Sequence, residues 1–186
     1  MDWSNVFEDA RGYDEFLAQY ATPPQLERWR SMHDRIVLSD DQRSLLAGFT
    51  RTMPVLVMAG AWCGDCVNQV PILAHFATAA SAIRLRIIDR DAREDVARAL
   101  SINGGKRVPA VLFLSEDFQE TARYGERTLA AYRRLAADQL GGACPTGIVP
   151  PSEELVAAVT KEWLEQFERV HLILRLSTRL REKHGD

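Results

Sequence analysis

Residues 54–66 read Pro-Val-Leu-Val-Met-Ala-Gly-Ala-Trp-Cys-Gly-Asp-Cys, an apolar run that ends in two cysteines three positions apart. The part over 54–58 is short and continuously apolar, which is typical of a strand buried on both faces. From Val67 to Ala77 the apolar residues recur at helical spacing. The sequence therefore predicts that Cys63 lies where a central strand ends and a helix begins.

Further strands and helices alternate after the cysteines. Residues 83–88 (Ile-Arg-Leu-Arg-Ile-Ile) predict a second strand, and Asp91 with Glu94 three positions later is typical of a capping box, here starting a helix that runs to Leu100. This order implies a parallel pair of strands joined by a right-handed crossover. The core is completed by an apolar strand, its hairpin partner and a helix, over 110–114, 120–124 and 129–140.

The segment before this core is predicted to be helical. Apolar residues spaced by threes and fours over 3–49 predict three helices. A Thr-Pro-Pro sequence at 22–24 separates the first two, because proline tolerates a helix start and not its interior. The third helix is expected to start after Ser39 or Asp40, since either residue is a good N-cap.

The segment after the core combines a loop and a helix. Glycines and prolines over 141–152 predict a connecting loop, after which Ser152 caps a long helix with one apolar stripe. The stripe is interpreted as a core contact, and a dimer interface is the alternative. We predict an α/β fold, a mixed sheet flanked by helices, in a single domain over 1–186: an N-terminal helical extension (1–50), a core (51–141), and a loop with a C-terminal helix (142–186).

Length, composition and charge exclude several protein classes. The chain has 186 residues, 46% hydrophobic and 26% charged, as in ordinary globular proteins. Its formal net charge of −3 provides no basic field for nucleic acid or anionic membranes. The longest apolar run, 54–62, has nine residues, whereas a membrane-spanning helix needs about 20. The N-terminus lacks the basic start of a secretion signal, so we expect a cytoplasmic protein.

The two neighbouring cysteines predict redox chemistry. A thiol at a helix start faces unpaired amides and the positive end of the helix dipole, and both favour the thiolate. Cys63 is therefore expected to be the acidic, exposed sulfur. Cys66 follows one helical turn later, where it can attack a mixed disulfide formed on Cys63. Gly64 allows a close approach at the turn, and Trp62 is expected to shield one side of the sulfur pair.

These residues resemble the thioredoxin superfamily. The resemblance rests on the strand before the motif, on Trp62-Cys63-Gly64-Asp65-Cys66, and on Val108-Pro109 at a later strand start. It implies a thioredoxin-like fold in which the Val108–Pro109 bond is cis and this segment offers backbone hydrogen bonds to a bound substrate. More narrowly, the chain looks like a bacterial branch of small thioredoxin-like proteins with helical extensions.

Two positions depart from thioredoxin itself. Val57 stands where thioredoxin has a buried acid that assists proton transfer, so the kinetics of thioredoxin do not carry over. Asp65 replaces the proline usual between the cysteines. Its negative charge is expected to oppose thiolate formation, which makes a dithiol more reducing.

The cysteines and the basic residues also admit other roles. Structural zinc needs four ligands, and Cys144 and the histidines lack the spacing of a zinc site, so we expect no metal. Cys144 is interpreted as a free thiol without a role, and a third redox thiol stays open. Basic residues near the C-terminus are interpreted as complementing a helix dipole, with an anionic partner as the alternative: Arg175, Arg179, Arg181 and Lys183.

Together these features predict a thiol–disulfide oxidoreductase. Cys63 attacks and Cys66 resolves, on a disulfide-containing protein or a low-molecular-weight thiol substrate, with a recycling reductant and no dissociable cofactor. Trp62, Gly64, Asp65, Val108 and Pro109 shape the site. The expected oligomeric state is monomer or dimer. The alternative is a redox-inactive binding or scaffold protein that keeps the fold, and Val57 favours it most.

Overall fold

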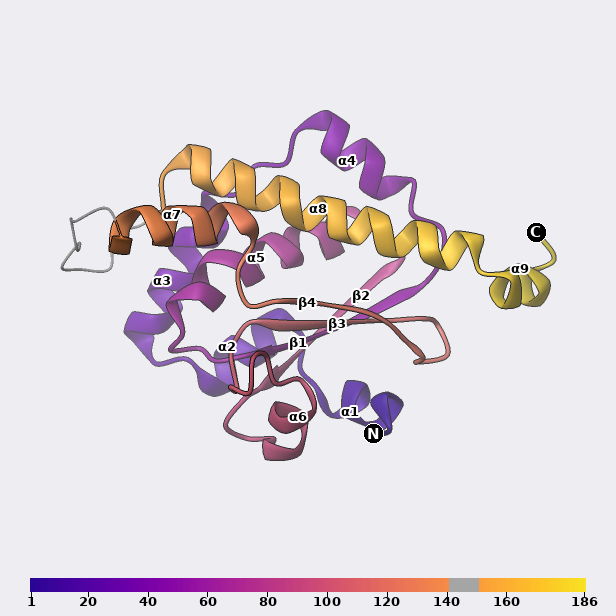
Figure 1. Ribbon diagram of the computed structural model, residues 1–186, viewed down its shortest axis with the longest axis horizontal. Coiled ribbons are helices and arrows are strands. Elements are labelled where there is room, and N and C mark those ends of the chain that lie inside the picture. The colour runs from indigo at the N-terminus through magenta and orange to yellow at the C-terminus, as the bar shows by residue number, and fades with distance from the viewer. Residues whose placement is uncertain (141–150) are drawn as a thin grey trace.

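Four strands form a mixed sheet in the order β2-β1-β3-β4 (Figure 1). β1 (Met53–Ala59) and β2 (Ile83–Asp89) are parallel, whereas β3 (Ala110–Leu114) pairs antiparallel with both β1 and β4 (Glu120–Gly125). All of β1 is buried, as expected for an apolar strand in the middle of the sheet. The computed structural model describes residues 1–140 and 151–186.

Helices cover both faces of the sheet. Figure 1 shows α5 (Gly64–Ala79), α7 (Leu129–Leu140) and α8 (Glu153–Leu176) on one side and α1 (Trp3–Asp9) and α6 (Glu94–Ala99) on the other. Phe167 of α8 lies edge-on between Phe76 of α5 and Phe113 of β3, with ring centroids 5.3 and 5.0 Å away. Each buried phenylalanine contributes about 1.5–3 kcal/mol. The predicted α/β fold with extra terminal helices is confirmed.

The N-terminal segment contains one more helix than predicted. After α1 the chain extends over Ala10–Gly12 before α2 (Tyr13–Tyr20), followed by α3 (Pro23–Asp34) and α4 (Asp40–Ala47). The break occurs because the backbone of Arg11 pairs with that of Ile87 at the edge of β2, with nitrogen–oxygen distances of 2.8 and 2.7 Å. The spacing of apolar residues gives no information about such a backbone pairing.

The start of α4 follows the sequence prediction. Ser39 is its N-cap and its Oγ accepts a hydrogen bond from the backbone N–H of Gln42 at 3.2 Å. The Gln42 side chain in turn accepts from the Ser39 N–H at 2.9 Å. These two bonds form a capping box, which fixes where α4 begins.

The capping box predicted for α6 is wrong. This helix begins at Glu94, and its N-cap is Arg93, which makes no side-chain cap hydrogen bond. The carboxylate of Asp91 instead accepts hydrogen bonds from the side chains of Arg90 and Trp62, at 2.8 and 3.3 Å. Two nearby donors thus compete with the helix for this residue, which its spacing from Glu94 does not reveal.

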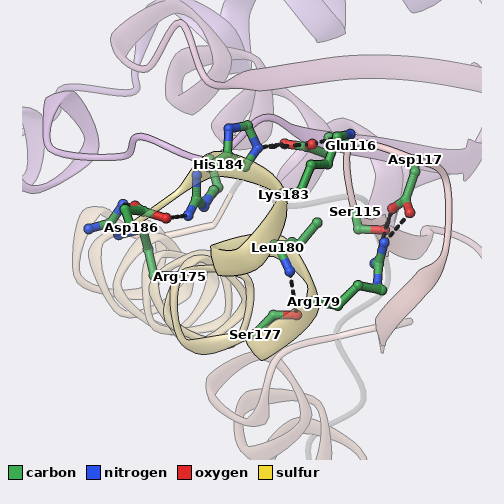
Figure 2. Close-up of polar contacts among 11 residues, drawn as sticks. Ser115, Glu116, Asp117, Arg175, Ser177, Arg179, Leu180, Lys183, His184 and Asp186 are labelled. Carbon is green, nitrogen blue, oxygen red and sulfur yellow. Dashed lines mark hydrogen bonds and ion pairs between the residues drawn. The ribbon is translucent and has the colours of Figure 1, made fainter.

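The C-terminal helix begins after Ser152 as predicted, and a second short helix follows it. Ser152 Oγ accepts a hydrogen bond from the Leu155 N–H at 3.2 Å, but the helix stops at Leu176 and Ser177 caps a separate α9 (Thr178–His184). Figure 2 shows three basic side chains of α9, those of Arg179, Lys183 and His184, directed toward acids of the turn between β3 and β4. Arg179 pairs with Asp117, while Lys183 and His184 pair with Glu116 at 2.5 and 2.8 Å. Arg175, Arg181 and Lys183 lie in the last turns of α8 and α9, as the helix-dipole prediction requires, whereas Arg179 lies in the first turn of α9 and contradicts it.

Two sequence predictions lie beyond the part of the chain just described. The connecting loop was predicted over 141–152, and only its last two residues are described. Cys144 also lies outside the described residues. Among the helices that are described, none is long and apolar enough to cross a membrane.

Candidate active site

Cys63 lies at the junction of β1 and α5, as the sequence predicts. It is the N-cap of α5, with extended backbone angles, and its N–H donates to the Gly60 carbonyl at 3.0 Å. The backbone N–H of Cys66 donates to Cys63 Sγ at 3.4 Å. The sulfur thus occupies the position where a helix stabilises a negative charge.

The Val108–Pro109 segment lies directly opposite this sulfur. Its peptide bond is cis, as the thioredoxin resemblance implies. The Cys63 thiol donates a weak hydrogen bond to the Val108 carbonyl oxygen, with a sulfur–oxygen distance of 3.5 Å. The fold therefore brings together two motifs that lie far apart in the sequence.

The pKa values of the two thiols are shifted in opposite directions. A hydrogen bond from the Cys66 thiol is the main cause that lowers the pKa of Cys63 from its ordinary 9.0 to about 7, against the opposing effect of burial. The charge of Asp65 also raises the pKa of Cys63, as expected, but it ranks below these two effects. Burial raises the pKa of Cys66 well above its ordinary value. At neutral pH about half of the Cys63 thiols are therefore thiolates, while Cys66 stays protonated.

The prediction that Cys63 is exposed is wrong. Its exposed fraction is 8% and that of Cys66 is 0%. Its neighbour Trp62 is 45% exposed, with the Arg90 guanidinium 4.4 Å from its ring centroid. Sequence reasoning also missed Gly60, where an added Cβ would lie 2.6 Å from the Trp62 ring. Only glycine at 60 leaves Trp62 this position.

Asp65 belongs to a charged network that the sequence analysis did not identify. Arg127 donates from Nε to Asp65 Oδ1 at 2.9 Å and from Nη2 to Oδ2 at 2.5 Å. It also donates to Glu126 at 3.0 Å, and this buried carboxylate accepts from Arg107 and Tyr132 at 2.8 Å each. The residues come from three separate segments, so no local pattern indicates the network.

Two buried tryptophans from the flanking helices also reach the site. Trp29 of α3 donates from its indole N–H to the Ala61 carbonyl at 2.9 Å, two residues before Cys63. Trp163 of α8 donates to the side chain of Gln69 on α5 at 3.0 Å. Gln69 in turn donates to the Glu126 carbonyl at 2.9 Å. Both helical extensions thus hold the segment that carries the cysteines.

Three further sequence predictions concern Val57, Gly64 and metal binding. Val57 is fully buried in β1, so an apolar side chain occupies the position of thioredoxin's buried acid. Gly64 is the first residue of α5, with open space where a Cβ would project. Within the described part of the chain, no three His, Cys, Asp or Glu side chains are grouped as a metal site requires.

Comparisons with known proteins identify one sequence family and two similar structures. A sequence family described as thioredoxin matches residues 11–138, which include both cysteines and Val108-Pro109. A protein of unknown function from Pseudomonas aeruginosa has a similar structure, with a TM-score of 0.72 and 16% identity over 91% of this chain and 96% of its own. An HIV epitope-scaffold gives a TM-score of 0.66 and 19% identity over 90% and 99% of the two chains.

These comparisons differ in what they establish. The two structural matches have low identity and therefore show a shared fold alone. No curated protein matches the chain in sequence. The thioredoxin family match covers more than half of the chain, and the sheet order and the cis Val108–Pro109 bond accompany it. The chain therefore belongs to the thioredoxin family.

Proposed function

We propose that this protein catalyses thiol–disulfide exchange, with Cys63 as the attacking sulfur and Cys66 as the resolving sulfur. The observation that carries the proposal is the pairing of a thiol of lowered pKa, at the start of α5 and 3.5 Å from the Val108 carbonyl, with a buried thiol of raised pKa. Such a pair separates the nucleophile from the resolver.

The exchange proceeds in two displacements. The Cys63 thiolate attacks one sulfur of a substrate disulfide, forms a mixed disulfide, and releases the other sulfur as a thiolate that takes up a proton. Cys66 then loses its proton and attacks the Cys63 sulfur, which breaks the mixed disulfide and releases the second substrate thiol. The substrate gains two electrons and the protein keeps a Cys63–Cys66 disulfide. A dithiol or other thiol reductant must reduce that disulfide before the next cycle.

The proposed substrates are disulfides of proteins or of small thiols. Val108 and Pro109 are proposed to present backbone groups to the chain that flanks the substrate disulfide. Trp62 is proposed to form one wall of the site, because it is the exposed aromatic beside Cys63. Gly64 and Asp65 complete the surface at the start of α5.

Cysteine substitutions test the proposal. Cys63→Ser is expected to abolish reduction of a disulfide-bonded test protein, because serine is a far weaker nucleophile. Cys66→Ser is expected to accumulate a mixed disulfide on Cys63, visible by mass spectrometry. Cys144→Ser changes the one cysteine outside the Cys63–Cys66 motif and is the matched control, which is expected to retain activity. Equal residual activity in the Cys63 and Cys66 variants would contradict the assigned roles.

The pH dependence of alkylation provides a second test. Only the thiolate reacts, so below its pKa the alkylation rate of Cys63 is expected to rise about tenfold per pH unit. Because the pKa is lowered to about 7, the rate should level off near pH 7 rather than near 9. Iodoacetamide labelling of the reduced protein, followed by peptide mapping, measures this profile. A rate that still rises tenfold between pH 8 and 9 would contradict the assignment of Cys63 as the acidic thiol.

The scaffold alternative rests on Val57 and receives less support. A scaffold does not require two thiols of different acidity opposite a cis-proline segment. Titration with a thiol redox buffer separates the two functions. The proposed enzyme is expected to form and break the Cys63–Cys66 disulfide reversibly within the range of cellular potentials.

A further inference from the structure

An acidic residue between two redox cysteines is expected to weaken the reactive thiolate. The charge of Asp65 indeed raises the pKa of Cys63, yet the pKa stays below its ordinary value. Asp65 is part of the first turn of α5, so it cannot move far from the sulfur without unwinding the helix. Another group must therefore limit the effect of the Asp65 charge on the pKa of Cys63.

The counter-charge comes from the loop between β4 and α7. The Arg127 guanidinium meets both oxygens of the Asp65 carboxylate, at 2.9 and 2.5 Å. This two-bond arrangement fixes the orientation of the carboxylate as well as balancing its charge. The two side chains are 22% and 30% exposed, so solvent screens the pair less than it screens pairs on the open surface.

Arg127 is itself held in position by other contacts. Its Nη1 donates to Glu126 at 3.0 Å, and the Glu126 side chain is only 6% exposed. Arg107 and the Tyr132 hydroxyl donate to the same carboxylate. The network contains two carboxylates and two guanidiniums, so it is neutral as a whole. Arg127 therefore keeps its position when Asp65 is changed.

Among the groups around Cys63, Asp65 is the nearby charged residue whose effect on the thiolate must be balanced. On α5, Cys66 and Asp65 act on the Cys63 sulfur. The opposite segment offers the Val108 carbonyl, and Arg107 in that segment pairs with Glu126. On the β2–α6 side, Arg90 lies over Trp62 and pairs with Asp91.

We propose that Arg127 is a positioning residue for Cys63: it holds the Asp65 carboxylate and offsets part of its charge, so that Cys63 stays reactive beside an acidic neighbour. The inference rests on the proposed function only in taking Cys63 as the reactive thiol. It assigns to a residue outside the cysteine motif the control of that thiol's reactivity. The same pairing explains how the motif accommodates an aspartate between its cysteines.

Charge-changing variants of the full chain test the proposal, with the iodoacetamide labelling profile of Cys63 as the readout. Arg127→Gln exposes the Asp65 charge to the thiolate, and the midpoint of the profile is expected to rise by about half a unit to one unit. At pH 6 the Cys63 labelling rate then falls about 3- to 10-fold. Asp65→Asn has the opposite effect, because Arg127 is then unbalanced, and lowers the midpoint. The double variant is expected to return close to the wild-type profile.

Two controls separate charge from structure. Arg127→Lys keeps the positive charge and is expected to retain most of the wild-type profile. Arg134→Gln removes an exposed arginine that pairs with Asp138 within α7 and not with Asp65, and is expected to leave the profile unchanged. Urea denaturation verifies that each variant is folded. Should Arg127→Gln fail to fold, the double variant is compared with Asp65→Asn instead: its midpoint is expected to be higher, and equal midpoints in the two would contradict the proposal.

Specific results would overturn the inference. An unchanged profile in folded Arg127→Gln, a shift in the same direction in both single variants, or a double variant that keeps the full Arg127→Gln shift each contradicts it. Labelling of Cys63 needs no disulfide substrate. A protein inactive in disulfide exchange would therefore overturn the proposed function while the Arg127 profile still decided this inference.

Discussion

The two ends of the sheet are held to the flanking helices by different interactions. At the end where β1 leads into Cys63, buried indole groups of Trp29 and Trp163 make hydrogen bonds to the segment that carries the cysteines. At the opposite end, where β3 turns into β4, ion pairs to Glu116 and Asp117 join α9 to the turn (Figure 2).

This difference indicates where the structure is rigid. Buried hydrogen bonds cannot be replaced by water when one partner is lost, so their removal is costly. Partly exposed ion pairs are screened by solvent and salt, and each contributes about 0–1 kcal/mol. The extensions therefore fix the end of the sheet with the proposed chemistry more firmly than the opposite end.

The largest effect is expected for Trp163→Ala. Trp163 is fully buried, stacks edge-on against Tyr124 at 4.9 Å, and donates to Gln69. Its removal leaves a cavity between α8 and the sheet and is expected to lower the free energy of unfolding by about 3–5 kcal/mol. Urea denaturation measures the loss. Leu172→Ala, on the exposed side of the same helix, is the control with a loss of about 0.5 kcal/mol or less. Equal losses in the two variants would refute the role given to α8.

An intermediate effect is expected for Trp29→Phe. The ring still fills most of the space, but the Ala61 carbonyl loses its indole donor, which costs about 1–3 kcal/mol. Because Ala61 precedes Cys63 by two residues, hydrogen exchange in the loop over 60–63 should also become faster. Trp3→Phe, in the half-buried part of α1, is the matched control. Unchanged exchange in the loop would show that Trp29 does not hold it.

The smallest effect is expected for Arg179→Gln. This change removes the pair with Asp117 but leaves the buried Leu180, which also anchors α9. The expected loss is about 0–1 kcal/mol, and it should shrink further in high salt. Urea denaturation at low and high salt measures both. A loss as large as that of Trp29→Phe would remove the distinction between the two ends of the sheet.

The sequence predicts the central part of this molecule well because its signals are local. The run over 54–58, the cysteine spacing and the proline at 109 each determine the structure of their own segment. The predicted strands at 83–88, 110–114 and 120–124 agree with β2, β3 and β4 to within one residue at each end. These elements follow from continuous apolar patterns, which tertiary contacts reinforce.

The predictions that fail depend on partners distant in sequence. The gap between α1 and α2 exists because Arg11 pairs with Ile87, and Asp91 contacts Trp62 instead of capping α6. The Arg127–Asp65 pair and the indole bonds of Trp29 and Trp163 join residues 32 to 94 positions apart. No periodic pattern in the sequence indicates such long-range contacts. The burial of Cys63 depends on the same packing between distant segments.

Gly125 shows how a position outside the motif restricts which substitutions the chain tolerates. It lies at the end of β4 with a φ of +140°, and a Cβ there would lie 2.4 Å from the Pro109 carbonyl oxygen. Any side chain at 125 would press on the segment opposite Cys63. A saturation library selected for correct folding should therefore recover glycine almost exclusively at this codon, while neighbouring codons of the same strand accept a broad range of residues.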